Sequence, residues 1–264
     1  MSNLYNIQLM LIDVLKKNAS IYNILKILLN SFFQTYQYHN LVMFSVILLF
    51  IILFFIPVDS YENEIYSIDK TTLQKDKFGY LHLFGEIKNK SEKTLTNITL
   101  SSNFSDLDNN VIGTYSRTPE INTLNPNQFS AFEIIYLDRN SIDKVKNYSL
   151  LVEYKVGKEK PNLLSIDHVN DRLDFTGFYY INGEITNIGT NTAFNVTVVA
   201  TIYDLDGNII GITKAITEPF IITSQNKAAF GLAVNAKTIS SKIKDFVLQA
   251  YSDKYLSNTF NLKK

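Results

Sequence analysis

Two acidic loops come closest, among all the residues of this chain, to the types and spacing that a chemical site requires. Each loop places Asp, Asp and Asn at its first, third and fifth positions. The two sets are Asp106, Asp108 and Asn110, and Asp204, Asp206 and Asn208. Oxygen ligands at this spacing are typical of calcium loops, but such loops also place Gly sixth and Glu twelfth. Neither loop does so, which favours a solvated hairpin turn, with calcium at Asp204, Asp206 and Asn208 as the alternative.

The histidines and the absence of cysteine limit which metal sites and catalytic groups the chain can form. His39, His82 and His168 have no second histidine at metal-ligand spacing, so the sequence predicts surface or strand-edge positions for them. A chain with 0 cysteines excludes disulfides, thiol catalysis, iron–sulfur centres and copper sites of the cupredoxin type. It also contains no Gly-Xaa-Ser-Xaa-Gly, phosphate-cradling loop or His-Glu-Xaa-Xaa-His. The expectation is a protein without enzymatic activity and without a cofactor.

Asn-Xaa-Ser/Thr triplets are frequent in the second part of the chain. The candidate glycosylation sites are Asn89, Asn97, Asn103, Asn147 and Asn195. The alternation of apolar and polar residues places Asn97, Asn103 and Asn195 on outward strand faces. The alternative is that an Asn-rich and Thr-rich chain forms such triplets by chance.

An uncharged run from Leu41 to Val58 divides the chain. Eighteen residues at about 1.5 Å per residue span roughly 27 Å, close to the hydrocarbon thickness of a bilayer. The sequence predicts a single transmembrane helix over 41–58. A cleaved signal peptide is the alternative, but the run begins forty residues into the chain and lacks a small-Xaa-small exit.

Residues 1–40 are apolar with one polar stripe. The polar positions recur at steps of three or four, namely Asp13, Lys16, Lys17, Ser20, Asn23, Lys26, Asn30 and Gln34. This periodicity predicts an amphipathic helix lying in the headgroup plane, with a cytosolic helical pair or a partner-binding helix as alternatives.

The charges constrain location and partners. Lys plus Arg and Asp plus Glu both number 25, so no basic surface for nucleic acid is expected. Lysines flank the apolar run almost evenly, but the triplets crowd its distal side. We therefore expect the N-terminus in the cytoplasm, a single pass through the cell membrane and extracytoplasmic C-terminal domains. Asn18 should then remain unmodified.

The distal sequence repeats itself at an offset of 98 residues, without a gap from Ile65 to Gly157. The matching segments include Ser67-Ile68-Asp69 with Ser165-Ile166-Asp167, Gly85-Glu86-Ile87 with Gly183-Glu184-Ile185, Asn89 with Asn187, and Ala131-Phe132 with Ala229-Phe230. A duplication of this kind predicts two domains, 59–158 and 159–264, joined by a short charged linker near Lys158 to Asn162.

Within each copy the apolar period is two, as in strands with one buried face. One face of the clearest pair of strands comprises Ile98, Leu100, Ser102 and Phe104, and Val196, Val198, Ala200 and Ile202. The other face includes Asn97 and Thr99, and Asn195, Thr197 and Thr201. Asp-Gly at Asp206-Gly207 signals a hairpin. Six or seven short strands per copy predict a mainly β fold of two tandem immunoglobulin-like β-sandwiches, preceded by the amphipathic segment and the transmembrane helix.

These motifs resemble the FxLYD domain of prokaryotic envelope proteins. The residues that carry the likeness are Gly183-Glu184-Ile185, Asn187, Asn195-Val196-Thr197, Tyr203-Asp204, Gly207-Asn208 and Ala228-Ala229-Phe230. The eponymous stretch reads Ala200-Thr-Ile-Tyr-Asp204 in the second copy and Ser102-Asn-Phe-Ser-Asp106 in the first. The resemblance implies non-catalytic immunoglobulin-like modules tethered to a membrane, and the Asn-rich composition suits an archaeal cell envelope.

The predicted function is a membrane-anchored envelope protein whose sandwiches bind or scaffold another surface component, either a protein or a glycan. A Tyr-rich face at Tyr179 and Tyr180 could bind such a partner. A structural spacer or stalk is the first alternative. An enzyme or an enzyme accessory subunit comes third, because no catalytic constellation supports it.

Overall fold

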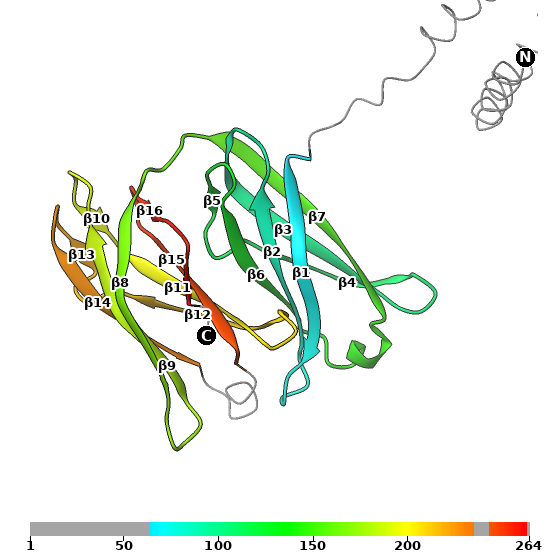
Figure 1. The fold of residues 1–264 in the computed structure, drawn as a ribbon. Helices are drawn as coiled ribbons and strands as arrows, with labels where there is room; N and C mark the ends of the chain where they lie inside the picture. Colours follow the sequence, from blue (N-terminus) through cyan, green and yellow to red (C-terminus); the bar gives the residue numbers. More distant parts are fainter. Residues whose placement is uncertain (1–63, 235–242, 263–264) are drawn as a thin grey trace, which may run out of the picture. The chain divides into compact units, whose positions relative to one another are not determined.

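The computed structural model describes residues 64–234 and 243–262 (Figure 1). These residues belong to one of the two compact units of the chain, Glu62–Lys264. The predicted amphipathic segment and the predicted span from Leu41 to Val58 lie outside the described residues. Within the described residues no helix is long and apolar enough to cross a bilayer.

Strands make up most of the described chain, and these residues include no α-helix, which confirms the predicted mainly β class. The first half contains β1 (Tyr66–Lys75), β2 (Leu81–Asn89), β3 (Thr94–Ser105), β4 (Val111–Arg117), β5 (Thr123–Leu124), β6 (Phe129–Tyr136), the 3-10 turn η2 (Ile142–Lys144) and β7 (Asn147–Gly157). The second half contains β8 (Asn162–Leu173), β9 (Tyr179–Asn187), β10 (Ala193–Phe194), β11 (Thr197–Tyr203), β12 (Ile209–Ile216), β13 (Ile221–Ile222), β14 (Lys227–Val234), β15 (Asp245–Tyr251), β16 (Leu256–Ser257) and β17 (Phe260–Leu262).

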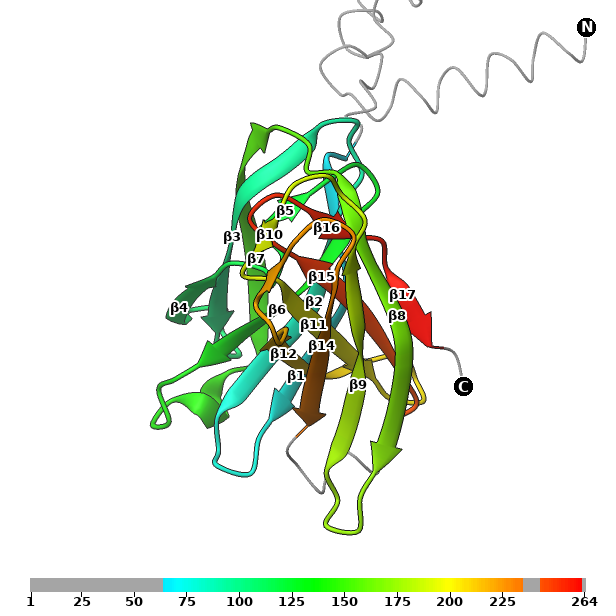
Figure 2. The same ribbon diagram turned by 90° about the vertical axis from the view of Figure 1, so that its left-hand side faces the viewer.

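The strands form sandwich-like sheets. In the first half, one sheet has the order β1-β2-β6, and the other has β3 between β4 and β7 and also paired with β5. In the second half, β8-β9-β14 and β12-β11-β15 correspond to these two layers, and β16 links them edge to edge. Figures 1 and 2 show the β1–β2 and β8–β9 hairpins reaching toward the same end of this unit.

The strand positions repeat with the sequence. β2, β4, β5 and β6 begin 98 residues before β9, β12, β13 and β14. Lys70 and His168, at equivalent positions in β1 and β8, both have a φ of 51° and mark the same irregularity in register. Equivalent sequence therefore produces equivalent backbone in both halves.

Each half has an apolar core, and Leu256 of the second half belongs to the core of the first. The predicted inward residues of β3 and β11 are buried, as the alternation requires; they are Ile98, Leu100, Ser102 and Phe104, and Val198, Ala200 and Ile202, with Val196 just before β11. The prediction of a single buried face is wrong for β11, because Thr197, Thr201 and Tyr203 on its other face are also buried. The first half covers that face.

The repeated Gly and Phe of the sequence form a cross-strand pair. Gly85 on β2 lies opposite Phe132 on β6, and Gly183 on β9 lies opposite Phe230 on β14. A Cβ atom on Gly183 would lie 2.7 Å from two ring carbons of Phe230, and one on Gly85 would lie 2.4 Å from Phe132. The Gly and the Phe recur together because the Phe ring occupies the space that a side chain at the glycine position would fill.

Gly183→Ala should therefore destabilise the fold by about 1–3 kcal/mol, the usual cost of overpacking. Gly211→Ala on β12 is the matched control, because a Cβ there meets no atom within 4 Å. Denaturant unfolding of the two variants measures the difference. Equal free energies of unfolding would contradict the pairing argument.

Candidate functional site

A buried polar contact joins the two halves. Glu86 on β2 is 6% exposed and accepts a hydrogen bond from the hydroxyl of Tyr203 on β11. Lys70 Nζ lies 3.2 Å from Glu86 Oε2 and 4.3 Å from the centroid of the Tyr203 ring. Burial, together with the neighbouring carboxylate, raises the pKa of Tyr203 well above its ordinary value, so its hydroxyl remains a donor at neutral pH.

Further contacts hold the halves in one arrangement. Phe84, Tyr203 and Ile209 form a small apolar cluster shared between the two sides. Gln74 Nε2 donates to the carbonyl of Ile209 at 2.9 Å, and Gln249 Nε2 donates to the carbonyl of Phe129 at 2.7 Å. Directional hydrogen bonds in addition to an apolar contact restrain rotation as well as separation.

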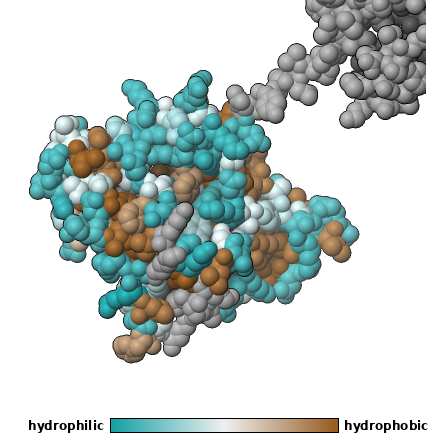
Figure 3. All heavy atoms as spheres, viewed as in Figure 1, coloured by the Kyte–Doolittle hydropathy of each residue, from teal (hydrophilic) through white to brown (hydrophobic). Residues whose placement is uncertain are grey.

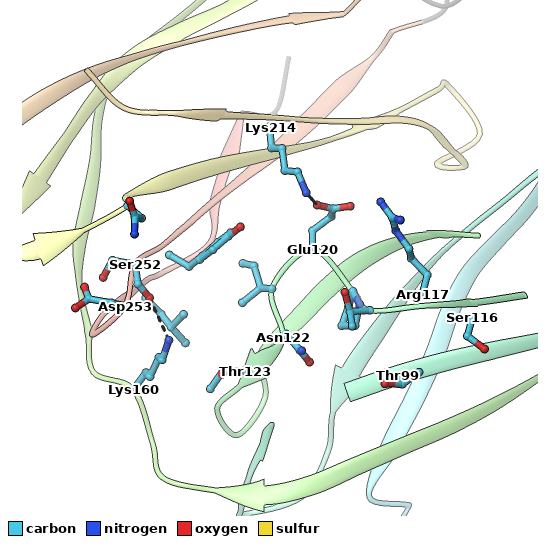
Figure 4. Close-up of a pocket in the computed structure, with 16 residues that line it drawn as sticks. Thr99, Ser116, Arg117, Glu120, Asn122, Thr123, Lys160, Lys214, Ser252 and Asp253 are labelled. Atoms are coloured by element: carbon cyan, nitrogen blue, oxygen red, sulfur yellow. Dashed lines mark hydrogen bonds and ion pairs between the residues drawn. The ribbon is translucent and has the colours of Figure 1, made fainter. Parts of the chain in front are cut away.

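A cleft of about 710 Å³ lies between the halves (Figure 4). Its lining comes from β3 and the β4–β5 segment of the first half, from the linker, and from Asn195, β12 and the β15–β16 turn of the second half. The lining residues are Thr99, Ser116, Arg117, Thr118, Pro119, Glu120, Ile121, Asn122, Thr123, Lys160, Asn195, Lys214, Tyr251, Ser252, Asp253 and Leu256. The volume lies within the roughly 300–1,000 Å³ typical of small-ligand sites.

The linker places a half-buried lysine in this cleft. Asn125 fixes the backbone of Lys160 from both sides, since its Nδ2 donates to the Lys160 carbonyl at 2.6 Å and its Oδ1 accepts the Lys160 amide at 3.2 Å. Lys160 Nζ donates to the backbone carbonyl of Ser252 at 3.1 Å. Burial lowers the pKa of Lys160, and the negative charge of Asp253 opposes this shift.

Other charges line the cleft at separate points. Arg117, at the end of β4, is exposed and makes no ion pair with any residue of 64–234 or 243–262. Lys214 Nζ lies 2.7 Å from Glu120 Oε2. Three cations thus face two carboxylates, which leaves one excess positive charge in the cleft.

The cleft is equipped for binding. Its titratable side chains are lysine, arginine, carboxylates and one tyrosine, and no histidine is present among the described lining residues. Among the described residues as a whole, no three His, Cys, Asp or Glu side chains converge in a group that could hold a metal ion. What the geometry offers a ligand is charge, hydroxyl and amide groups, and an aromatic ring.

The acidic loops are hairpin turns capped by their first aspartate. Asp204 Oδ1 accepts the amides of Asp206 at 3.0 Å and Asn208 at 2.8 Å. Asp106 makes the same pair of bonds in the first half. The β8–β9 hairpin uses Asp174 in this way, so the repeated spacing is accounted for by turn geometry.

The candidate glycosylation sites differ in accessibility. Asn89 is 0% exposed, and its Nδ2 donates to the carbonyls of Lys93 and Leu124. The Asn89 side chain therefore connects two segments of the backbone, and the folded protein has no room for a glycan on its amide. Asn187 makes the equivalent bonds to Asn191 and Ile222, which explains why the asparagine of the Gly-Glu-Ile-Xaa-Asn motif repeats.

The other four candidates lie nearer the surface. Asn97, Asn147 and Asn195 are exposed, and Asn97 and Asn195 have φ values of 51° and 53° at equivalent positions. Asn103 is half-buried and accepts a hydrogen bond from Thr114 Oγ1 at 2.7 Å. Asn195 lines the cleft, so a glycan on it would share that space.

The edge-strand prediction for His82 is wrong. β2 is the central strand of its sheet, and His82 Nδ1 lies 2.7 Å from Glu133 Oε1. The hydrogen bond to Glu133 is the main cause that raises the pKa of His82. Its Nε2 is 3.3 Å from Asp76 Oδ2 but lacks hydrogen-bond geometry, so that contact is electrostatic. His168 has a side chain 72% exposed, as predicted. His39 lies outside the described residues.

The predicted Tyr-rich face is only partly at the surface. Tyr179 is 5% exposed, with its hydroxyl bonded to Asp171, so it belongs to the core. Tyr180 is half-buried, with the Arg172 guanidinium 5.0 Å from its ring centroid. Figure 3 shows hydrophobic residues in separate patches among hydrophilic ones, and the most exposed apolar side chains, including Phe78, Leu107 and Phe175, lie in separate hairpin turns. Because its side chain is buried, Tyr179 cannot contribute to a binding face.

Comparisons with known proteins leave the family open. No family model matches the chain, and no curated protein matches it. Similar solved structures include a red sea bream transglutaminase, with 11% identity, a TM-score of 0.26, and coverage of 74% of this chain and 31% of that one. The Amycolatopsis orientalis exo-chitosanase CsxA shows 8% identity, a TM-score of 0.26, and coverage of 74% and 26%. The chain spans less than a third of either structure, and likeness at this level carries no argument about function.

The aspartate caps predict acid sensitivity. The Thr176 hydroxyl, with help from the amides of Thr176 and Phe178, holds the pKa of Asp174 below its ordinary value of 3.8. A carboxyl whose pKa is lowered by folding stabilises the protein above its unfolded pKa, and this contribution is lost as the pH falls through the folded value. Asp174→Asn creates the triplet Asn-Phe-Thr, so the variant is made in a host without Asn-linked glycosylation. It should lower the thermal midpoint at pH 7 and lower it less at pH 3.

Asp108→Asn is the matched control, because it removes the same charge from an exposed turn position whose carboxylate caps no amide in the described structure. Circular dichroism at the two pH values measures both variants. A midpoint difference for Asp174→Asn that is as large at pH 3 as at pH 7 would contradict the assignment.

Proposed function

We propose that this chain is a membrane-anchored envelope protein that binds another component of the cell surface through the cleft between its two halves. In this proposal the halves are tandem immunoglobulin-like sandwiches related to the FxLYD domain, and Leu41–Val58 anchors them on the outer face of the cell membrane. The protein acts by binding and has no catalytic role.

One observation carries the proposal: both halves, joined by the contact of Glu86 with Tyr203, contribute side chains to a single cleft. Arg117 and Glu120 come from the first half, Lys214 and Asp253 from the second, and Lys160 from the linker between them. A ligand in this cleft would contact groups that neither half presents alone. A fixed arrangement also lowers the entropy lost on binding, because the contacting groups are already in place.

The same contact supports a second candidate, a rigid spacer. Glu86, Lys70 and Tyr203 hold the halves together independently of any ligand. A pair of sandwiches fixed in this way could hold an attached component at a set distance from the membrane. This role would not require the cleft.

A membrane-impermeant cross-linking experiment in intact cells distinguishes the two roles. Thr118→Trp fills the cleft from an exposed lining position, and Leu151→Trp on β7 adds the same ring at an exposed position outside the lining and outside every Asn-Xaa-Ser/Thr triplet. Binding predicts that a surface component is captured by the native chain and by Leu151→Trp, and that Thr118→Trp reduces capture about tenfold or more.

Equal capture by both variants would overturn the cleft as the binding site and favour the spacer. Capture that occurs only with a membrane-permeant reagent would place the sandwiches in the cytoplasm and overturn the proposed location.

A further inference from the structure

We infer that the cleft holds an acidic saccharide, with the sugar carboxylate on Lys160 and with Arg117 as a second cationic contact. This inference rests on the proposed function, since it names the chemistry of the ligand for the same cleft. Four features of the lining support it.

The first feature is the unused hydrogen-bonding capacity of Lys160. Its ammonium group has three donors, and within the described residues one of them goes to the carbonyl of Ser252. No described carboxylate lies close enough to its Nζ to form an ion pair. A half-buried ammonium with free donors gains more from a bound anion than from water, because charge-assisted hydrogen bonds are strong where solvent is partly excluded.

The second feature is the placement of Arg117. Figure 4 shows Arg117 and Lys160 at opposite sides of the lining, one from β4 and the other from the linker. An arginine guanidinium offers five N–H donors in a planar fork that matches carboxylate geometry. Two cations on opposite sides suit a ligand that extends across the cleft.

The third feature is the modest net charge. The Glu120 carboxylate is held by Lys214, and Asp253 Oδ1 accepts the amide of Phe194 at 2.8 Å. These two carboxylates remain in the lining and repel a second negative charge on the ligand. One excess positive charge therefore matches a carboxylate better than a phosphate monoester, which carries close to two negative charges at neutral pH.

The fourth feature is the neutral part of the lining, which is rich in hydroxyl and amide groups. These residues are Thr99, Ser116, Thr118, Asn122, Thr123, Asn195 and Ser252. Tyr251 adds an aromatic ring against which the face of a sugar could pack. Such a surface favours a hydroxyl-bearing ring over the apolar chain of a fatty acid.

Calorimetric titration of the full 264-residue chain in detergent tests the inference. The chain is produced in a host without Asn-linked glycosylation, so that Asn195 carries no sugar. The probes are short oligomers of galacturonate, glucuronate and mannuronate, each paired with its neutral methyl ester. At least one acidic oligomer should bind, and its ester should bind about tenfold more weakly or worse.

The variants locate the carboxylate. Lys160→Gln and Arg117→Gln should each weaken binding about tenfold, whereas Lys158→Gln should change it less than about twofold. Lys158 is exposed in the same linker and does not line the cleft, so it controls for the loss of one positive charge. Arg117 is exposed, and within the described part its side chain makes no ion pair, so its variant remains informative even if Lys160→Gln disturbs the linker.

Three results would overturn the inference. They are equal binding of acid and ester, binding that neither cleft variant changes, and no binding of any acidic oligomer. If the cross-linking experiment still captures a surface component sensitive to Thr118→Trp, the acidic saccharide is wrong while the proposed function stands.

Discussion

The burial of one carboxylate, that of Glu86, is the constraint on which the arrangement of the two halves depends. A charge removed from water must be compensated, and here the compensation comes from both halves. Lys70 shares the sheet of Glu86, while Tyr203 reaches it from β11 of the second half. Separating the halves would remove the Tyr203 hydrogen bond and expose Phe84 and Ile209. The same contact joins the two halves whose residues form the walls of the cleft.

The duplicated framework carries two different surfaces. Glu184, the counterpart of Glu86, has a side chain 41% exposed and pairs with Lys227 at 3.2 Å. The counterpart of Tyr203 is Ser105, which is too short to span an interface. The first copy therefore contributes the face that contains Glu86 to the contact, and the second copy contributes the different face that contains Tyr203.

The framework could be predicted from the sequence because it depends on local pattern and on repetition. Period-two alternation identified the buried faces of β3 and β11, and the shared offset aligned the strands of the two halves. Gly85 and Asn89 were visible as repeated motif residues. Their partners, the Phe132 ring and the carbonyl of Leu124, follow only from the register of strands distant in sequence.

The candidate site could not be predicted in the same way, because it lies between the halves. The alternation of the sequence places Thr201 and Tyr203 on an outward face. In the structure both are buried, because the first half covers this face. The sequence predicts Lys160 only as one of the charged residues of a short linker. Its neighbours in the sequence do not indicate that Asn125 binds its backbone or that it lines a cleft. The one available signal was asymmetry between the copies: positions that differ in an otherwise gap-free duplication, such as Tyr203 and Ser105, mark surfaces with separate roles.

The central claim is that the two halves form one rigid unit, and a distance distribution between them tests it most directly. Because the chain has 0 native cysteines, Glu153→Cys on β7 and Asn170→Cys on β8 allow selective spin labelling of exposed positions in the two halves. Pulsed dipolar spectroscopy of the full chain should give one narrow distribution that does not change with salt concentration. A broad distribution, or several separated distances, would show that the halves move independently and would contradict the fixed cleft.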